Sequence, residues 1–567
     1  MQTYTLWGRR YGKIYVFSSH RQRRSRIVWI SVFTVVFLSI AGITFTGAFT
    51  APGEHQKNGS TALSTTTSSV ASVPITSPVT SPAIISENLR PGTTSWRITA
   101  GASPTLIQGF ATTTYAAPGS AVDLYVSSQL PTYRVLAYRM GWYQGKGARL
   151  IWTSSPQEGT VQPPCGLDTS VNMVSCTSWH RSLVIPITEA FVPGDYLIKL
   201  DAGPHAQSYV LLTVWDPQST ATYVIMNRSL VEQGWNTYGG YSFYKGAGPC
   251  IIDSMSYPTC NRARVVSFDR PYDTSYGSSD FLTNEYPLVS LAEREGLDVT
   301  YITDITLSDH PTLLAHHRAL LDLDHDESWT YAERLAVQSA QVSHGLNVVY
   351  FGAAAMVRHV RLEASPLGPD QQEIDYRNSY EDPLFGHGNP MQVTGNTWES
   401  PPASWSPLSQ IGSQYSGYLS PGVYAPLTVS DPGSWVFAGT GLTQGSSIPN
   451  AIASDINHVL LSSATPPNLD VLAHSPIPVS DGTLDGVWGG YSYSDMVYFT
   501  LPSNAGVIDT GNNVWIGDLI PCPATSACPA PLITRITENI LAGVGHGPLG
   551  VIHPPHPNLT SITPYGS

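Results

Sequence analysis

An uncharged run of 23 residues, Ile27 to Phe49, constrains this chain more than any other feature. Its length matches the roughly 20 apolar residues that cross the hydrocarbon core of a bilayer as a helix. Residues 1–26 hold seven Lys and Arg and no acid, and such basic flanks stay on the cytoplasmic side. A cleaved signal peptide is the alternative, although its apolar core is usually about 7–15 residues long. The pattern predicts a single-pass cell-membrane anchor at residues 27–49, a basic cytoplasmic N-terminus at 1–26, and an extracellular remainder.

The charge balance outside the predicted anchor is strongly acidic. Removing the seven N-terminal basic residues from the 28 Lys+Arg leaves 21 against 41 Asp+Glu, a net charge of −20. Proteins that bind nucleic acid usually present a basic patch or stripe. The sequence holds no such stripe after the anchor, and we therefore expect no nucleic-acid partner.

The six cysteines all follow the apolar run and fall into three close pairs: Cys165/Cys176, Cys250/Cys260 and Cys522/Cys528. Close pairs in an exported chain are typical of local disulfides. Structural zinc is the alternative, but none of these pairs has the C-x-x-C spacing common at zinc sites. The spacing therefore predicts three structural disulfides.

Two segments separate the anchor from the rest of the chain. Residues 50–92 are a Ser/Thr/Pro tract with few large apolar side chains, so burial cannot offset the entropy of ordering it. We predict an extended linker there. From 93 to 216, short runs rich in Val, Ile, Tyr and Leu are separated by Pro, Gly and Asp, which is typical of strands. This spacing predicts an immunoglobulin-like β-sandwich.

The pattern changes near residue 217. Near-continuous apolar runs such as ATYVIMN, LDVTYIT, RALLDL and LNVVYFGA alternate with helical patterns. The alternation predicts an α/β domain over residues 217–545, with a mostly parallel sheet covered on both faces. RARVVSF is expected to be the second strand of this sheet. Residues 546–567, which contain HPPHP, are predicted to be a solvated C-terminal tail.

Acids and a histidine crowd together after one predicted strand, in the turn Asp324-His-Asp-Glu327. The strand RALLDL ends near Leu323, and Thr330 with Glu333 fits a capping box for a helix that starts near Tyr331. The turn therefore lies where the carboxyl end of a strand meets a helix N-terminus. In open α/β sheets this edge is where ligands bind.

Two further strands are expected to send polar or phenolic residues to the same edge. RARVVSF runs into Asp269–Tyr272, and the first strand leads to an aromatic loop at Gln233–Tyr244. Taken alone, each motif has an ordinary interpretation, because an H-x-E turn is usually solvated and a Tyr/Gly loop usually packs. Their convergence at one edge would make a site.

Several segments, in chain order, resemble one family: GWNTYGGYSFY, VVSFDRPY, EYPLVSLAEREGLDVTYITD, DHDESW, NVVYFGAAAMVRHVRLE and YRNSYEDP. This order is similar to that of the large (beta) subunit of N,N-dimethylformamidase and its relatives, over roughly residues 220–520. The resemblance implies an α/β domain of the glutamine-amidotransferase type. It also implies a mononuclear ferric iron (Fe3+) held by two tyrosine phenolates and one glutamate.

The resemblance implies the iron ligands residue by residue. Tyr272 and Glu327 match one phenolate and the carboxylate, and Tyr238 matches the second phenolate, with Tyr244 as the alternative. Anionic oxygen donors of this kind suit a hard, highly charged ion. Such an ion can polarise an amide carbonyl and acidify a bound water. The chain departs from the family at Trp235, where relatives often carry Tyr.

The resemblance also implies two catalytic residues. His325 matches the family's catalytic histidine and would move a proton between water and the leaving amine. Asp455 matches a supporting acid, for which relatives tend to have the longer Glu. The implied activity is hydrolysis of an amide C–N bond, with a small amide or a cell-envelope component as substrate, and an oligomer is possible. The alternative is a non-catalytic surface protein that binds glycan or a partner through its sandwich and aromatic loop, with a vestigial metal site.

Overall fold

The computed structural model describes residues 77–248, 251–252, 258–259, 261–477, 492–523 and 527–562. Within these residues, no helix combines the length and the apolar character needed to cross a membrane. The predicted anchor at 27–49 and the cytoplasmic segment lie outside the described residues. Disulfides join Cys165 to Cys176 and Cys522 to Cys528, as predicted. The pair Cys250/Cys260 also lies outside the described residues.

The predicted linker ends earlier than residue 92. Helix α1 (Pro82–Asn88) starts with a proline in its first turn and buries Ile84, which joins the core of the α/β domain. Its last residue, Asn88, donates a hydrogen bond of 2.6 Å from Nδ2 to Glu293 Oε2. This segment is ordered because it supplies both an apolar and a polar contact to residues far along the chain.

A β-sandwich follows, and its two sheets enclose one apolar core. The smaller sheet has the order β1-β3-β9, with all pairs antiparallel. The larger sheet has the order β2-β11-β10-β4-β5, with β6 paired to β4. The strands are β1 (Ile107–Ala111), β2 (Tyr115–Ala116), β3 (Ala121–Ser128), β4 (Thr132–Met140), β5 (Ala148–Thr153), β6 (Gln157–Glu158), β9 (Leu183–Pro186), β10 (Gly194–Asp201) and β11 (Gln207–Val214).

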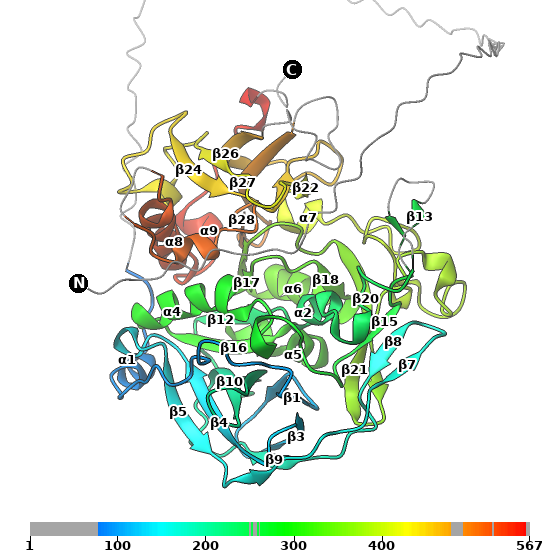
Figure 1. Cartoon of the computed structure of the whole chain (residues 1–567). Coiled ribbons are helices and arrows are strands. Elements are labelled where there is room, and N and C mark those ends of the chain that lie inside the picture. The colour runs from blue at the N-terminus through cyan, green and yellow to red at the C-terminus, as the bar shows by residue number, and fades with distance from the viewer. Residues whose placement is uncertain are drawn as a thin grey trace, which may run out of the picture. The chain divides into compact units, whose positions relative to one another are not determined.

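The central sheet of the α/β domain has seven strands in the order β16-β12-β17-β19-β28-β27-β26 (Figure 1). The pairs from β16 to β28 are parallel, and β27 and β26 are antiparallel. The mostly parallel sheet is therefore present. Its strands are β12 (Tyr223–Asn227), β16 (Val299–Thr303), β17 (Ala319–Leu323), β19 (Asn347–Phe351), β26 (Asp470–Ile477), β27 (Ser492–Thr500) and β28 (Gly506–Asp509).

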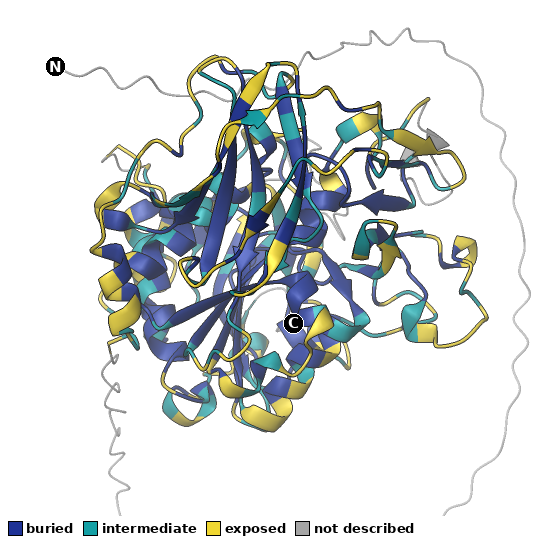
Figure 2. Ribbon diagram, turned by 90° about the horizontal axis from the view of Figure 1, so that it is seen from below, coloured by how far each residue is buried: buried dark blue, intermediate teal, exposed yellow. Residues whose placement is uncertain are grey.

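Helices cover both faces of this sheet, and separate apolar cores lie on either side. The strands between these cores are buried along their length (Figure 2). One core includes α4 and α8, and the other includes α6. The helices are α2 (Ser229–Trp235), α3 (Phe281–Asn284), α4 (Tyr286–Arg294), α5 (Asp304–Asp309), α6 (Tyr331–His344), α7 (Leu408–Ile411), α8 (Ala530–Val544) and α9 (Leu549–Ile552).

The strand order defines where a ligand would be expected. In chain order β12, β16, β17, β19 and β28 are the first to fifth parallel strands, so their spatial order is 2-1-3-4-5. The order reverses between β12 and β17, and doubly wound sheets bind ligands at the carboxyl ends of strands beside such a switch point. The turn after β17 is the predicted acidic turn that contains His325.

The predicted second strand does not belong to the central sheet. RARVVSF forms β15 (Val265–Ser267), which pairs antiparallel with β21 (Gly368–Ile374) in a side sheet with β20 (Arg358–Ser365) and β18 (Ser328–Thr330). Both types of sheet bury continuous apolar strands, so the run of Val and Phe does not distinguish them. The residues after β15 therefore follow a strand of the side sheet, whereas those after β17 follow a strand of the central sheet.

The remaining described strands form two-stranded antiparallel sheets: β7 (Gly166–Asp168) with β8 (Met173–Ser175), β13 (Ile251–Ile252) with β14 (Pro258–Thr259), β22 (Gln414–Tyr418) with β25 (Asp455–His458), and β23 (Ala425–Thr428) with β24 (Ser447–Ile452). Pairing with β22 holds β25, which starts at Asp455, in the α/β domain. The C-terminal residues up to 562 contain α9 and make contacts with the α/β domain, although several of them, including Pro554, His556 and Pro557, are exposed. His553 stacks on Trp435 with ring centroids 4.6 Å apart, and its carbonyl accepts a hydrogen bond from the Tyr498 hydroxyl.

Candidate active site

The turn between β17 and β18 holds its residues in fixed positions. Asp324 has a φ of +49°, so the backbone reverses directly after β17. A Cβ at Gly352 would lie 1.8 Å from the carbonyl oxygen of Asp324, so only glycine fits opposite this reversal. The Asp326 carbonyl accepts hydrogen bonds from the backbone N–H of Met356 and from Trp329 Nε1, both at 2.9 Å. The turn is therefore anchored on both sides.

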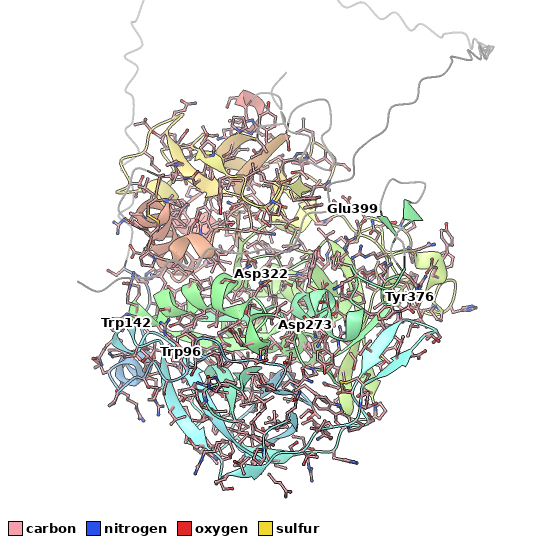
Figure 3. The ribbon with its side chains drawn as sticks, in the orientation of Figure 1. Trp96, Trp142, Asp273, Asp322, Tyr376 and Glu399 are labelled. Atoms are coloured by element: carbon pink, nitrogen blue, oxygen red, sulfur yellow. A yellow bond between two sulfur atoms is a disulfide. The ribbon has the colours of Figure 1, made fainter. Side chains whose placement is uncertain are left out.

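The helix after this turn begins as predicted. Thr330 Oγ1 accepts a hydrogen bond from the Glu333 backbone N–H, and Glu333 Oε2 accepts one from the Thr330 N–H, which completes the capping box at the start of α6. Asp322, on β17, is buried and lies among the central elements in Figure 3. The turn residues between these two points are thus set by a buried strand on one side and a capped helix on the other.

Three predicted site residues meet at this turn. His325 Nε2 lies 3.1 Å from Glu327 Oε2, within hydrogen-bonding distance. On its other side, His325 Nδ1 lies 3.8 Å from Asp455 Oδ2. The side chains are 14%, 7% and 19% exposed for His325, Glu327 and Asp455, so solvent reaches all three. The imidazole therefore stands between two carboxylates at the switch point of the sheet.

Asp455 comes from a distant part of the chain and is held in place by a hydrogen-bonded asparagine. Asn513 Nδ2 donates to Asp455 Oδ2 at 2.9 Å, and the Asn513 N–H donates to the Asp455 carbonyl. The same Asn513 accepts, through Oδ1, a hydrogen bond of 2.6 Å from the Ala353 N–H of the β19–β20 loop. Asn513 thus links the loop after β19 to the acid opposite His325.

Burial affects the two neighbouring groups in opposite directions. It raises the pKa of Glu327, while the charges of Arg358 and Arg377 lower it. It lowers the pKa of His325 below its ordinary value, while the charge of Asp455 opposes that shift. A lowered histidine pKa favours the neutral imidazole at neutral pH. If Nε2 carries the proton and donates to Glu327, the Nδ1 lone pair is free to accept a proton.

Two arginines and two aromatic rings line the same edge. The Trp235 ring stacks on Tyr244 with centroids 3.6 Å apart, and its centroid lies 6.3 Å from that of His325. The Arg377 guanidinium lies 4.2 Å from the Tyr244 ring centroid, and that of Arg358 lies 6.0 Å from it. Arg358 Nε also lies 4.0 Å from Glu327 Oε2. These four side chains form an aromatic and cationic wall beside His325.

Each of the two arginines keeps a buried nitrogen free. Among the described residues, Arg358 Nε and Arg377 Nη2 have no hydrogen-bond partner. Arg358 Nη1 is held by the Asn396 carbonyl at 2.8 Å, and Arg377 Nε by Asp375 Oδ2 at 3.3 Å. Leaving a buried charged donor unpaired is costly, so these N–H groups are suited to an oxygen of a bound molecule.

Tyr238 lies away from this cluster. Its hydroxyl accepts a hydrogen bond of 2.9 Å from Gln108 Nε2, on β1 of the sandwich. Its ring packs with Phe110 and Trp179, also in the sandwich part of the chain. No hydrogen bond, ion pair or ring contact among the described residues joins Tyr238 to Glu327. The phenol therefore faces the sandwich, whereas the alternative, Tyr244, is the tyrosine that lies beside the His325 cluster.

Tyr272 lies at the boundary between the sandwich and the α/β domain. It lines two cavities between the layers, together with Leu211 of β11 and Glu232 of α2 among other residues. Burial is the main cause that raises its pKa, followed by the charge of Glu232. The next residue, Asp273, accepts a hydrogen bond of 2.6 Å from Thr237 Oγ1 and lies nearer the sandwich than Asp322 in Figure 3. The preceding strand, β15, belongs to the side sheet and not to the central sheet.

The residues at the His325 cluster do not fit the ferric ion that the family resemblance implies. Of the three implied ligands, Glu327 is at the cluster, and the two phenols are not joined to it. Tyr244 is at the cluster, but its ring lies against Trp235 and the Arg377 guanidinium. Arg358 already supplies a positive charge next to Glu327, and like charges repel a cation. The ferric site therefore stays a prediction of the family resemblance.

Sequence reasoning identified the histidine and both acids of this cluster but not the arginines. Arg358 is the first residue of β20, whereas Arg377 lies outside the helices and strands and has a positive φ of 56°. Their approach to Glu327 and Tyr244 arises from tertiary packing, for which the sequence gives no local signal.

The fold and the cluster define an α/β protein with a histidine between two carboxylates at the switch point of a doubly wound sheet. The family model described as N,N-dimethylformamidase beta subunit-like, C-terminal, matches residues 134–527, and the chain belongs to this family. The match starts within β4, so it includes more of the sandwich than the resemblance over roughly residues 220–520 suggested.

Other comparisons add little. No curated protein matches the chain. One partly similar solved structure is a cycloisomaltooligosaccharide glucanotransferase of Paenibacillus sp. complexed with cycloisomaltoheptaose. It is 11% identical with a TM-score of 0.13, and the match covers 23% of this chain and 17% of that one. A likeness of this extent carries no argument about fold or function.

Proposed function

We propose that this protein hydrolyses an amide-type C–N bond, with His325 as the general base. The observation that supports it is the position of the imidazole, with Nε2 3.1 Å from Glu327 and Nδ1 3.8 Å from Asp455, at the ligand-binding edge of the sheet. A base must reach the proton that it takes, directly or through one water. The gap between Nδ1 and Asp455 is too long for a direct hydrogen bond and suits a water that bonds to both.

In the proposed hydrolysis, side chains of this chain can carry out every proton transfer. Water attacks the carbonyl carbon, and Nδ1 of His325 takes the proton that the water loses. Glu327, next to Nε2, stabilises the imidazolium that forms. When the tetrahedral intermediate collapses, the C–N bond breaks and the imidazolium returns the proton to the leaving amine. The products are a carboxylic acid and an amine.

Arg358 and Arg377 are proposed to hold the oxygen that becomes negative. Their free N–H groups, Arg358 Nε and Arg377 Nη2, are buried and positioned beside the His325 cluster. Donors that are already oriented toward a developing oxyanion commonly contribute about 3–4 kcal/mol to the barrier. In this proposal the guanidinium groups supply positive charge where the resembled family would use a metal.

The place of action is proposed from the sequence. The apolar run at 27–49 with its basic flank supports a membrane anchor, and the two disulfides support an oxidising compartment. The substrates proposed are small amides or amide groups of the cell envelope. Homo-oligomers are compatible with this proposal.

The test is amine release from a panel of amides by the purified full-length chain. The panel includes formamide, N-substituted formamides, acetamides and amidated cell-wall fragments. His325→Gln is expected to lower kcat/KM by roughly 10²–10⁴ because the general base is lost. His387→Gln is the matched control, since His387 is an exposed histidine outside the cluster. Equal hydrolysis by wild type and His325→Gln would exclude His325 as the base.

The exposed tryptophan favours a second candidate, a binding protein without catalysis. Trp235 is 45% exposed and stacked on Tyr244, and such an aromatic platform is suited to the apolar face of a sugar ring or a flat ligand. Absence of amine release from every amide in the panel, together with binding of glycan fragments that Trp235→Ala abolishes, would establish this candidate over the hydrolase.

A further inference from the structure

A second cluster of ligating side chains is separate from the His325 cluster and lies where the C-terminal segment meets the edge strand of the central sheet. Asp431 follows β23, Asp470 is the first residue of β26, and His556 follows α9. One ligating atom from each of these three residues lies within 4.8 Å of those of the other two. Figure 1 shows the C-terminal segment in red beside β26.

The contacts within this cluster leave one buried carboxylate incompletely bonded. His556 Nδ1 lies 3.1 Å from Asp431 Oδ2, and the His556 backbone N–H donates to Asp470 Oδ2 at 3.2 Å. Asp470 is only 1% exposed, and its Oδ1 has no hydrogen-bond partner among the described residues. A buried carboxylate oxygen without a donor is costly unless a proton or a cation reaches it.

The two carboxylates also lie close to each other, which raises that cost. The nearby imidazole can compensate one of them as a cation, but its Nδ1 is directed at Asp431 rather than at Asp470 Oδ1. A divalent cation at the centre of the three groups would neutralise both acids at once and would use the imidazole as a neutral ligand. It would thereby satisfy the oxygen that the protein leaves free.

We propose that Asp431, Asp470 and His556 bind a divalent first-row metal ion, with Zn2+ as the best-suited representative. Oxygen and imidazole donors at about 2.0–2.2 Å are typical of zinc, and tetrahedral ligands then lie about 3.3–3.6 Å from one another. The 3.1 Å between His556 and Asp431 is slightly shorter than that separation, so a small side-chain shift would admit the ion. The His556 side chain is 62% exposed, which leaves room for a water as the fourth ligand.

The metal would fix the C-terminal segment to the sheet. Asn558 already binds the start of β26, since its Oδ1 accepts from the Val471 N–H at 2.8 Å and its Nδ2 donates to the Val471 carbonyl at 3.0 Å. These bonds place His556 opposite Asp470 before any ion binds. The site is thus preorganised, and a metal would lock the segment that the backbone has already docked.

The experiment is a calorimetric titration of the full-length, EDTA-treated chain with Zn2+. Wild type is expected to bind one ion that His556→Gln and Asp431→Asn each weaken at least tenfold. Both substitutions are at partly exposed positions, and the buried Asp470 is left unchanged so that folding is preserved. His205→Gln, an exposed histidine in the sandwich, and His325→Gln are matched controls that are expected to keep this ion.

A second readout locates the ion on the C-terminal segment. Zn2+ is expected to slow carboxypeptidase digestion of wild type and of His205→Gln, but not of His556→Gln. Titration curves of wild type and His556→Gln that coincide, or a wild type that binds no Zn2+, would each overturn the proposal. Loss of the ion in His325→Gln with retention in His556→Gln would place it at the other cluster, with the same consequence.

Discussion

Two arginine–carboxylate networks in this protein use the same residue types in different ways. One joins β4 of the sandwich to α4 of the α/β domain through Arg139 and Glu293, and the other lies around Glu327 and Arg358. In the first, Glu293 Oε1 accepts from Arg139 Nη2 at 2.6 Å and from the Tyr301 hydroxyl at 2.7 Å. In the second, the side chain of Glu327 has one hydrogen-bond contact, from His325.

This difference in hydrogen bonding distinguishes a structural ion pair from a cluster that could bind a substrate. Arg139 is fully buried, and each of its side-chain nitrogens donates a hydrogen bond. Nε donates to the Pro193 carbonyl, Nη1 to the Tyr143 hydroxyl and Glu293 Oε2, and Nη2 to the Pro193 carbonyl and Glu293 Oε1. Among the described residues, Arg358 Nε has no hydrogen-bond partner. A saturated network has no capacity left to bind a substrate, whereas an unsaturated one beside solvent has. Beside His325, the unpaired donors of Arg358 and Arg377 are therefore what could bind a ligand, in addition to their charge.

The largest expected effect comes from breaking the saturated network. Glu293→Gln removes the charge that compensates Arg139, and loss of one partner of a buried pair costs about 3–5 kcal/mol of unfolding free energy. Urea denaturation monitored by tryptophan fluorescence measures it. Asp123→Asn is the control, because its partner Arg181 is 55% exposed and such pairs contribute about 0–1 kcal/mol. Equal losses in the two variants would contradict the structural role assigned to Glu293.

The second effect concerns stability against pH at the interface between the layers. Burial raises the pKa of Asp195 to about 7, and its Oδ2 has no partner. The folded state therefore holds a proton that the unfolded state loses above about pH 4, so unfolding free energy falls as pH rises from 4 to 7 and then levels off. In Asp195→Asn, the unfolding free energy is expected to decrease less steeply with pH over this range, by up to about 1.4 kcal/mol per pH unit.

The measurement for Asp195 is a series of urea titrations between pH 4 and pH 8.5. The variant and the wild type are expected to differ least near pH 4, where the carboxyl is protonated in the folded state and still partly protonated in the unfolded state. Above pH 7 the variant is expected to be the more stable, by at most about 4 kcal/mol. Parallel curves over the whole range would show that Asp195 does not titrate between the folded and unfolded states.

How much of this could be predicted from the sequence depends on how local each feature is. The turn from Asp324 to Glu327 and the capping box after it are contiguous, and both were predictable from periodicity and helix-start signals. Arg139 and Glu293 lie 154 positions apart, and nothing in the local pattern of either residue indicates the other. Long-range polar pairs of this kind arise from packing, which a single sequence does not encode in a readable pattern.

The position of the predicted phenolate ligand Tyr272 could not be derived from local sequence pattern either. Tyr272 was expected at the edge of the central sheet because RARVVSF has the composition of a buried parallel strand. The strand instead pairs antiparallel with β21, and only the tertiary arrangement decides between the two. Asp455 lies 130 positions after His325, and it entered the predicted site through the family resemblance rather than through local pattern.

The third expected effect is the pH dependence of kcat/KM, which tests the role of His325 in the network around Glu327 and Arg358. Because His325 must be neutral to accept a proton and burial lowers its pKa, kcat/KM is expected to rise about tenfold per pH unit below that pKa. The plateau is expected to start below about pH 6.5, the ordinary histidine value. Rates over pH 4.5–8 on the best amide of the panel measure the profile. An acid limb of the same shape in His325→Gln would assign it to another group.

The smallest expected effect tests whether Tyr244 is a ligand or part of the wall. Its ring is held between Trp235 and Arg377, and those contacts use the ring rather than the hydroxyl. Tyr244→Phe keeps the ring, so kcat/KM is expected to stay within about twofold of wild type. Trp235→Ala is the companion variant and is expected to raise KM further, since it removes the exposed platform beside His325. Iron content and the visible spectrum are recorded for both. If Tyr244→Phe abolished both a phenolate-to-iron band and activity, Tyr244 would be an iron ligand, as the family resemblance implies, and not part of the aromatic wall. The comparison with the saturated Arg139 network would then no longer explain the free donors of Arg358.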